Sequence, residues 1–207
     1  MTGENDDITS LRDRHNILYG KMKLTGIVNF DAFDQAMKGY ERIEDKKKDI
    51  LVIIDFTKPS TEERLYVIDL EHEKLLYKTH VAHGRNSGSN YATSFSNESG
   101  SHKSSLGFFV TDHTYQGRNG YSLILHGLEK GFNDNARERA IVIHGAAYCN
   151  PGVIASAGRL GRSFGCPALP QSVNKEIIDT IKEGALMYIY ANNAEYSERS
   201  SILNNFS

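Results

Sequence analysis

A cysteine and a histidine in the second half of the chain are the side chains best suited to chemistry. Cys166 lies within residues 158–167, a stretch rich in glycine, which predicts a turn that exposes the sulfur to a cleft. His144 closes an apolar run and is followed by Gly145, which places it at the end of a strand. A thiol nucleophile and an imidazole base are the minimum set for covalent acyl transfer, and they need only be close in space. The sequence therefore predicts an acyl-transfer site.

The residues beside Cys166 indicate how each step would be catalysed. A free thiol has a pKa of about 8.5, and a neighbouring imidazolium lowers it. We expect His144 to take the proton from Cys166 and to return it to the leaving amine. The backbone N–H groups of Gly165 and Cys166 are expected to bind the oxyanion, because Pro167 has no N–H. Ser163 is expected to hold His144 through its hydroxyl or its carbonyl group.

Three other basic residues are candidates for a role in substrate binding. Arg85 lies in a segment rich in Gly, Ser and Asn, residues 84–103, and Arg162 lies beside the nucleophile. A guanidinium group suits a carboxylate, and Arg162 is also expected to lower the pKa of the thiol. His126 ends a predicted strand as His144 does, which makes it a candidate for a supporting role in the site.

The cysteine and histidine content argues against a metal centre. The chain has two cysteines, too few for a four-ligand zinc site. His80 and His83 are three residues apart on a predicted strand, so they face opposite sides of it. We expect no metal and no organic cofactor. Cys149 is expected to be a buried, inert side chain; a disulfide or a redox pair with Cys166 is the alternative.

Charge and hydropathy exclude several classes of protein. The 207 residues include 24 Lys+Arg and 26 Asp+Glu, a net charge of -2, whereas non-specific nucleic-acid binding needs an excess of basic residues. No apolar run approaches the roughly 18 residues of a membrane-spanning helix. The first residues are polar and acidic, unlike a secretory signal. We expect either a cytosolic protein or a chain from which an export signal has been removed.

Apolar periodicity predicts the elements that position these residues. An amphipathic helix is expected from residue 31 to about 48 after an irregular N-terminal segment, and another over residues 173–183 with Ser172 as its cap. Short β-branched runs predict strands at residues 50–56, 64–70, 74–82, 106–112, 121–128, 139–144 and 185–190. The predicted parts of the chain are an N-terminal tail with a helical extension (1–48), a catalytic domain (49–195) and a C-terminal tail (196–207).

The spacing of the candidate residues is itself informative. His144-Gly145 is followed downstream by Ser163-Phe164-Gly165-Cys166, and residues 104–110 read Ser-Ser-Leu-Gly-Phe-Phe-Val. These stretches resemble the L,D-transpeptidase (YkuD-like) catalytic domain of bacterial cell-wall enzymes, which carries a His-Gly, a Ser-His-Gly-Cys signature and a Thr-Pro-x-Gly-x-Phe strand. Phe164 stands where that signature has a second histidine, whose contribution is then absent or supplied elsewhere, with His126 as the candidate.

The resemblance spans roughly residues 50–191. Residues 81–88 and 127–136 look closer to one subfamily, the murein L,D-transpeptidase catalytic domain-like proteins. The fold implied is mostly β with flanking helices: a YkuD-like sandwich of two packed mixed sheets with a C-terminal helix, extended by the N-terminal helix.

The resemblance also implies an activity on peptidoglycan. Cys166 would attack the carbonyl between the third residue of a stem tetrapeptide and its terminal D-alanine, release D-alanine and form a thioester. An amine from a second stem would resolve the thioester into a cross-link. The expected partners are peptidoglycan stem peptides, with no nucleic acid and no metal, for a monomer in the periplasm or cell envelope. Acylation of Cys166 by carbapenems is implied as well.

Two other functions stay open at the level of sequence. The same acyl-enzyme with water as the acceptor would make an L,D-carboxypeptidase, and nothing in the residues separates the two acceptors. A domain that binds peptidoglycan without catalysis is an alternative of another class. The presence of both Cys166 and His144 argues against that second alternative.

Overall fold

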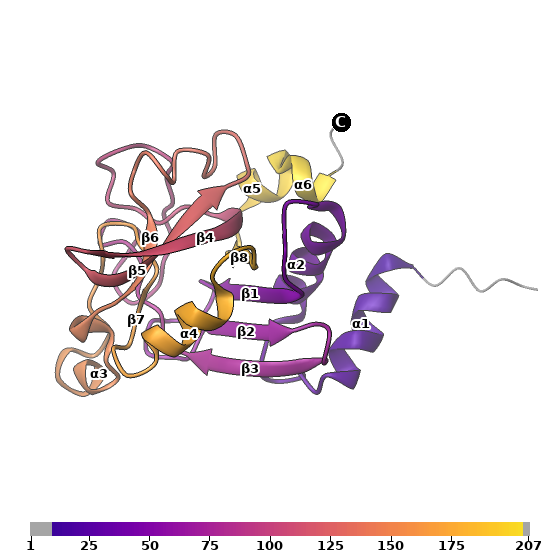
Figure 1. Cartoon of the computed structure of the whole chain (residues 1–207), viewed down its shortest axis with the longest axis horizontal. Coiled ribbons are helices and arrows are strands. Elements are labelled where there is room, and N and C mark those ends of the chain that lie inside the picture. Colours follow the sequence, from indigo (N-terminus) through magenta and orange to yellow (C-terminus); the bar gives the residue numbers. More distant parts are fainter. Residues whose placement is uncertain (1–9, 205–207) are drawn as a thin grey trace, which may run out of the picture.

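The computed structural model describes residues 10–204, which form a curved sheet with helices on both sides (Figure 1). Within these residues the sheet has eight strands in the order β3-β2-β1-β8-β4-β5-β6-β7. The strands are β1 (Ile50–Asp55), β2 (Leu65–Asp69), β3 (Lys74–Thr79), β4 (Gly107–Gly117), β5 (Gly120–Gly127), β6 (Val142–Gly145), β7 (Ala168–Leu169) and β8 (Leu186–Tyr190). The helices are α1 (Leu11–Lys21), α2 (Phe30–Arg42), the 3-10 turn η1 (Ala147–Cys149), α3 (Gly152–Ala157), α4 (Asn174–Ile181), α5 (Ala194–Arg199) and α6 (Ser201–Asn204).

The centre of the sheet consists of strands that are apolar on both faces. β1 lies between β2, which is antiparallel to it, and β8, which is parallel. A strand covered on both faces needs a continuous apolar run, and residues 50–54 supply one, with Leu51 and Ile54 fully buried. Its neighbour β8 is buried along its whole length.

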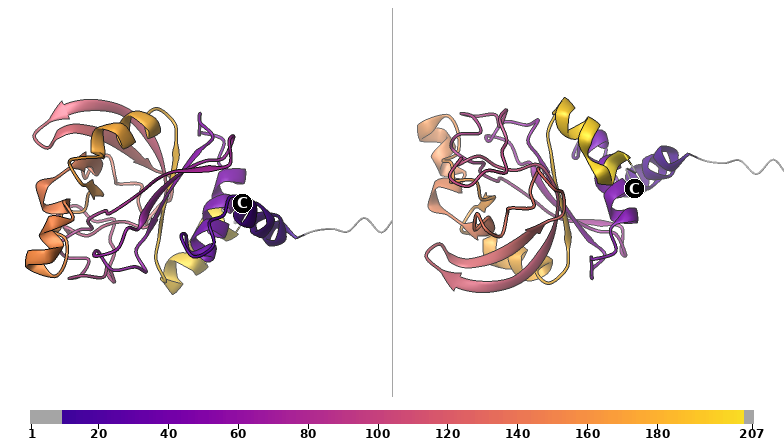
Figure 2. Two further views of the ribbon diagram at one scale, coloured as in Figure 1. Left: turned by 90° about the horizontal axis from the view of Figure 1, so that it is seen from below. Right: turned by 90° about the horizontal axis from the view of Figure 1, so that it is seen from above.

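Helices cover the two faces unequally. α1, α2, α5 and α6 lie on one side of the sheet, and α3 and α4 lie on the other (Figure 2). α2 begins after Asn29, whose side chain accepts hydrogen bonds from the backbone N–H groups of Asp31 and Ala32. It buries Phe33 and Met37 in the core shared with β1 and β8. This helix ends at Arg42, earlier than the charged run after it suggested.

The mostly β class with flanking helices is confirmed, but the strands join differently from the two packed sheets expected. β4 pairs with β8, and this pairing connects β1–β3 and β4–β7 into one continuous sheet. The long β4–β5 hairpin then bends away from β1 and β2 (Figure 2). One twisted sheet therefore encloses the core that two sheets were expected to enclose.

The N-terminal segment is helical where the sequence predicted irregular structure. Ser10 and Asp13 form a capping box at the start of α1. The helix is then held by polar contacts: Arg12 Nη1 and His15 Nδ1 lie 2.9 and 2.8 Å from the two carboxylate oxygens of Asp34, which is buried in α2. An apolar periodicity is weak here because these ion pairs hold much of the interface with α2. Residues 1–9 of the predicted tail lie outside the described residues.

The C-terminal region forms α5 and α6 where a tail was predicted. Tyr196 and Ser200 donate hydrogen bonds of 2.7 and 2.5 Å to the carboxylate of buried Glu129, and this fixes α5 against the sheet. α4 begins at Asn174 without a side-chain cap, so Ser172 does not have the expected role. Residues 205–207 lie outside the described residues. Within residues 10–204, no helix combines the length and the apolar character needed to cross a membrane.

Candidate active site

His144 and Cys166 lie in the same cleft, as the sequence predicted. His144 is in β6, which pairs in parallel with β7 so that His144 lies beside Ala168, two residues after Cys166. Prolines flank β7 on both sides and cannot donate ladder hydrogen bonds, which keeps it to an edge strand of two residues. The cleft has a volume of about 470 Å³ and is lined by Arg118, Asn119, His144, Gly145, Ala146, Ala147, Tyr148, Arg162, Ser163, Phe164, Cys166 and Gln171.

The turn that carries Cys166 is stabilised by Ser163. Its hydroxyl accepts a hydrogen bond from the N–H of Gly165 at 3.0 Å and donates one to the carbonyl of Cys166 at 2.7 Å. Gly165 has φ 125°, and a Cβ atom there would lie 2.8 Å from the carbonyl oxygen of Lys103, so the position requires glycine. Because the Gly165 N–H is engaged by Ser163, the N–H of Cys166 remains the candidate oxyanion donor.

The orientation of His144 comes from its own strand. Nδ1 lies 3.0 Å from the carbonyl oxygen of Gly145, and because a carbonyl only accepts, Nδ1 carries the proton. Nε2 is then the basic nitrogen. The expected hydrogen bond from Ser163 is wrong, because the hydroxyl of Ser163 is used within the turn and its carbonyl accepts the N–H of Arg85. Burial lowers the pKa of His144, so the imidazole is neutral at pH 7.

The electrostatics of Cys166 differ from the expectation. Its sulfur lies 3.6 Å from the carbonyl oxygen of Ala140, and burial raises the pKa of the thiol. The N–H of Val142 and the guanidinium of Arg139 act in the opposite direction. Both shifts favour the neutral thiol and the neutral imidazole in the cleft that the two residues share. An imidazolium does not lower the thiol pKa as predicted, and the nearby cation is Arg139, where Arg162 was expected.

Arg162 lines the cleft, and one nitrogen of its guanidinium binds backbone carbonyl groups. Nη1 donates to the carbonyl oxygens of Gly88 and Arg85, at 2.9 and 3.2 Å. These bonds connect the segment 84–103 to the turn that carries Cys166. A bridge between Gly84 and Ser163 also pairs the two segments. These contacts place the beginning of residues 84–103 against the turn that carries Cys166.

Phe164 is an exposed aromatic residue at the mouth of the cleft. Its side chain is 64% exposed, although large apolar side chains usually lie inside. The His102 ring lies 4.6 Å from it, and the guanidinium of Arg85 lies 5.6 Å from its centre. The imidazole of His102 therefore lies next to the position where the family signature has its second histidine, and Arg85 lies beside the same ring.

His126 lies away from the cleft, and its predicted place in the site is wrong. Its Nε2 is 2.6 Å from a carboxylate oxygen of Asp112 and 3.1 Å from Arg137 Nη1. It lines a different cavity, together with Lys47 and Glu183. Along β5 the neighbour of His144 is Ser122, four residues from His126, a displacement of about 13 Å in an extended strand.

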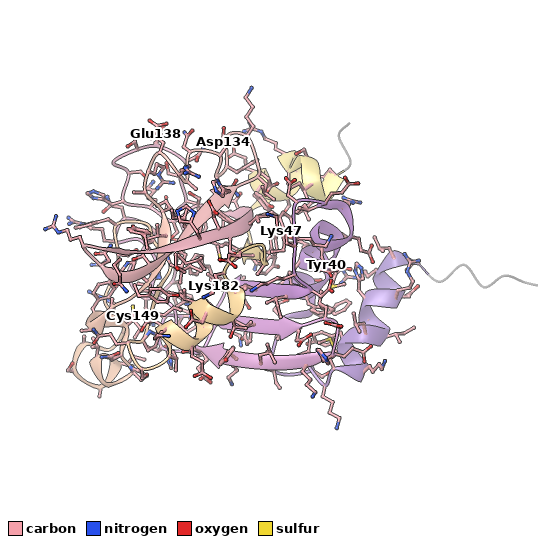
Figure 3. The ribbon with its side chains drawn as sticks, viewed as in Figure 1. Tyr40, Lys47, Asp134, Glu138, Cys149 and Lys182 are labelled. Atoms are coloured by element: carbon pink, nitrogen blue, oxygen red, sulfur yellow. The ribbon has the colours of Figure 1, made fainter. Side chains whose placement is uncertain are left out.

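Cys149 is the buried, free cysteine that the sequence predicted. Its thiol donates to the carbonyl oxygen of Ala168 at 3.2 Å, and burial raises its pKa to about 12. It lies inside the molecule just before α3 (Figure 3). Both cysteines are unpaired, which excludes the disulfide alternative for this structure. Within residues 10–204, no group of three or more His, Cys, Asp or Glu side chains gathers in a way that could hold a metal ion.

Sequence reasoning missed two arginines that surround the site. Arg139 donates hydrogen bonds to two backbone carbonyl and two serine hydroxyl oxygens beneath the turn that carries Cys166. Arg64 is fully buried, with Nη2 2.8 Å from His83 Nδ1 and 2.9 Å from the carbonyl oxygen of Val81. The backbone carbonyl of His83 in turn accepts the N–H of Ser163. An arginine whose partners are mostly carbonyl groups leaves no pattern in a sequence.

Comparisons with known proteins address the family directly. The family model of the L,D-transpeptidase catalytic domain matches residues 25–190, a range that includes α2. No curated protein matches the sequence. Similar solved structures include an L,D-transpeptidase from Mycobacterium smegmatis (13% identity, TM-score 0.44, 70% of this chain and 59% of that one). Two others are the L,D-transpeptidase LdtMt1 in complex with imipenem (11%, 0.42, 69% and 59%) and the helical cell shape determining protein Pgp2 from Campylobacter jejuni (12%, 0.46, 77% and 56%).

The chain spans between 56% and 59% of the length of these three proteins. The family model itself covers most of the chain, from just before α2 to the end of β8, and it contains both His144 and Cys166. The protein belongs to the L,D-transpeptidase catalytic domain family.

Proposed function

We propose that the protein is a cysteine acyltransferase that acts on peptidoglycan stem peptides as an L,D-transpeptidase. The observation that carries the proposal is the shared cleft of Cys166 and His144, with Nδ1 of His144 bound to the carbonyl of Gly145. That hydrogen bond leaves Nε2 with a free lone pair, which a general base requires. Membership of the L,D-transpeptidase family supports peptidoglycan as the substrate.

In the first half-reaction the sulfur of Cys166 attacks the carbonyl carbon that precedes the terminal D-alanine. His144 Nε2 takes the thiol proton as the C–S bond forms, so no free thiolate has to accumulate in the resting enzyme. The tetrahedral oxyanion accepts a hydrogen bond from the N–H of Cys166. The C–N bond then breaks, Nε2 returns the proton to the amine, and D-alanine leaves behind a thioester.

In the second half-reaction an amine from another stem peptide attacks the thioester. Nε2 removes a proton from that amine, the C–S bond breaks, and the sulfur of Cys166 recovers its proton. Water in place of the amine would make the protein an L,D-carboxypeptidase. The family match favours the amine as the acceptor.

The charges around the cleft suit a substrate with carboxylate groups. Arg118, at the turn of the β4–β5 hairpin, and Arg162 line it, and none of its lining residues within the described chain is acidic. Arg85 lies beside Phe164 at the mouth. We assign Arg85, Arg162 and Phe164 to substrate binding, because a guanidinium recognises a carboxylate and an exposed ring offers apolar contact. Action on the cell wall implies that the protein works in the envelope, and we propose that it does so as a monomer.

Incubation with purified muropeptides, followed by mass analysis of the products, tests the proposal. A tetrapeptide donor with an amine acceptor should lose D-alanine and gain a cross-link. Loss of D-alanine with only a shortened stem would indicate a carboxypeptidase. Neither product, with the Cys166 thiol still able to react with an alkylating agent, would reject peptidoglycan as the substrate and leave the nucleophile assignment standing.

A further inference from the structure

Arg139 has an arrangement that its place in the sequence does not suggest. It lies three residues before β6, and its guanidinium donates to the carbonyl oxygens of Ser96 and Lys103 at 2.8 and 2.7 Å. It also donates to the hydroxyls of Ser105 and Ser101, at 2.6 and 3.3 Å. All four partners are neutral. Within residues 10–204, no carboxylate lies within ion-pair distance of Arg139 (compare the pairs of Arg12 and Arg137).

The guanidinium lies directly against the nucleophile turn. A Cβ atom built on Gly165 would lie 3.4 Å from Nη2 of Arg139 and 2.8 Å from the carbonyl oxygen of Lys103, which Nη2 binds. Glycine therefore lets the turn approach the arginine closely, and Cys166 is the next residue. Because the site is half-buried, a charge acts there more strongly than in water.

We propose that Arg139 is a positioning residue for Cys166 that supplies the positive charge facing the sulfur when the thiol proton leaves for His144. It has a second task, since its four hydrogen bonds hold residues 96–105 beneath the turn. The assignment rests on the proposed role of Cys166 as the nucleophile.

The other charged and titratable groups near Cys166 are placed differently. His144 from β6 is neutral and serves as the base, and Tyr148 from η1 is neutral because burial raises its pKa. The guanidinium of Arg162 is turned to the carbonyls of Gly88 and Arg85. Arg118, at the tip of the β4–β5 hairpin, is exposed on the cleft wall. Burial raises the pKa of the Cys166 thiol, and Arg139 is the cation whose charge acts against that rise.

The rate of alkylation of Cys166 by iodoacetamide, measured against pH with the adduct located by peptide mass, tests this without any substrate. Arg139→Gln should move the midpoint of the profile to higher pH by about one unit or more, and slow alkylation at pH 7 about tenfold. Arg139→Lys keeps the charge and should stay near wild type. Arg137→Gln, an exposed neighbour bound to Asp112 and His126, is the matched control and should not change the profile.

A separate variant distinguishes the effect of the Arg139 charge from the effect of its hydrogen bonds to residues 96–105. Ser105→Ala removes the 2.6 Å hydrogen bond but leaves the guanidinium, so it should lower the thermal stability without moving the alkylation midpoint. An Arg139→Gln profile that coincides with wild type overturns the proposal. So does a Ser105→Ala shift as large as that of Arg139→Gln. If Arg139→Gln does not fold, an Arg139→Lys midpoint about one unit or more above that of wild type has the same consequence, because the charge is kept in that variant. Failure of peptidoglycan turnover would not affect these measurements.

Discussion

The two cysteines have similar partners but differ in exposure. Each sulfur lies near a backbone carbonyl, that of Ala168 for Cys149 and that of Ala140 for Cys166. Each is also near an arginine, whose charge favours the thiolate. Cys149 is nevertheless fully buried, with its pKa raised to about 12. Cys166 opens onto the cleft that His144 also lines, so access and a nearby imidazole distinguish the proposed nucleophile from Cys149 more than the cation does.

The arginines near the two cysteines, Arg64 and Arg139, also differ in the segments that they stabilise. Arg64, near Cys149, is fully buried, and burial lowers its pKa to about 9. Its hydrogen bonds to Val81 and His83 fix this segment, in which the carbonyl of His83 accepts a hydrogen bond from the N–H of Ser163. Arg139 lies instead against the turn itself. The region of Cys149 and Arg64 thus supports the turn from inside the molecule, whereas Arg139 lies against the turn that carries Cys166.

Replacement of Cys166 by alanine is the strongest test of this difference. The variant should lose D-alanine release by a factor on the order of a million, which is below detection, because no other group in the cleft replaces the nucleophile. Its thermal unfolding should stay close to wild type, because the side chain is only partly buried. Measurable turnover by Cys166→Ala in the muropeptide assay would remove Cys166 from the mechanism.

His144→Gln should have the next largest effect, about a hundredfold to ten-thousandfold loss of rate. Burial lowers the pKa of His144 below its ordinary value of about 6.5. A histidine with a lowered pKa stays neutral, and thus basic, to lower pH, so the wild-type rate should begin to fall only below about pH 6.5. Rates measured from pH 5 to 8 check this, and the acid limb should be absent from His144→Gln. An acid limb that persists in the variant would assign it to another group.

Carbapenem acylation distinguishes the two cysteines within one protein. The strained lactam offers an acyl group to a nucleophilic sulfur, so we expect one inhibitor mass per chain, located on Cys166. Cys149 should stay unmodified because it is fully buried. Intact-protein mass spectrometry of wild type and Cys166→Ala measures both, and an adduct that survives in Cys166→Ala contradicts the assignment. No adduct at all would mean that Phe164 reshapes the pocket against this inhibitor.

Much of the sheet follows from local sequence, because its strands are apolar runs that can be read directly. β1 and β8 are examples, and α2 and α4 have clear apolar stripes. β7 could not be found this way, since two residues between prolines carry no periodicity. α1 was not predicted because polar contacts to Asp34 anchor it, and such contacts leave no apolar periodicity in the sequence. The single sheet depends on the β4–β8 pairing, a long-range contact that no local pattern specifies.

In the site, the shared cleft of Cys166 and His144 could be predicted because turn glycines and a strand-end histidine have local signatures. The details that depend on backbone partners were not. His144 binds the carbonyl of its own neighbour Gly145, where Ser163 was expected. His126 has the same local pattern as His144, but the β5–β6 register places Ser122 opposite His144, and His126 lies opposite Val110 of β4, within reach of Asp112. Similar local sequence thus gave opposite outcomes, and only the pairing register separates them.

Cys149→Ser should have the smallest effect. It tests whether the buried region of Cys149 and Arg64 has only a structural role. The hydroxyl can keep the hydrogen bond to the carbonyl of Ala168, so the loss comes from placing a more polar group at a fully buried position. We expect a decrease of about 1–2 kcal/mol in the free energy of unfolding, measured by urea denaturation, with turnover within about twofold of wild type. Cys149→Ala, which removes the hydrogen bond as well as the sulfur, is the matched comparison. A large loss of turnover in both variants, with unfolding unchanged, would mean that Cys149 takes part in the chemistry and that burial does not make it inert.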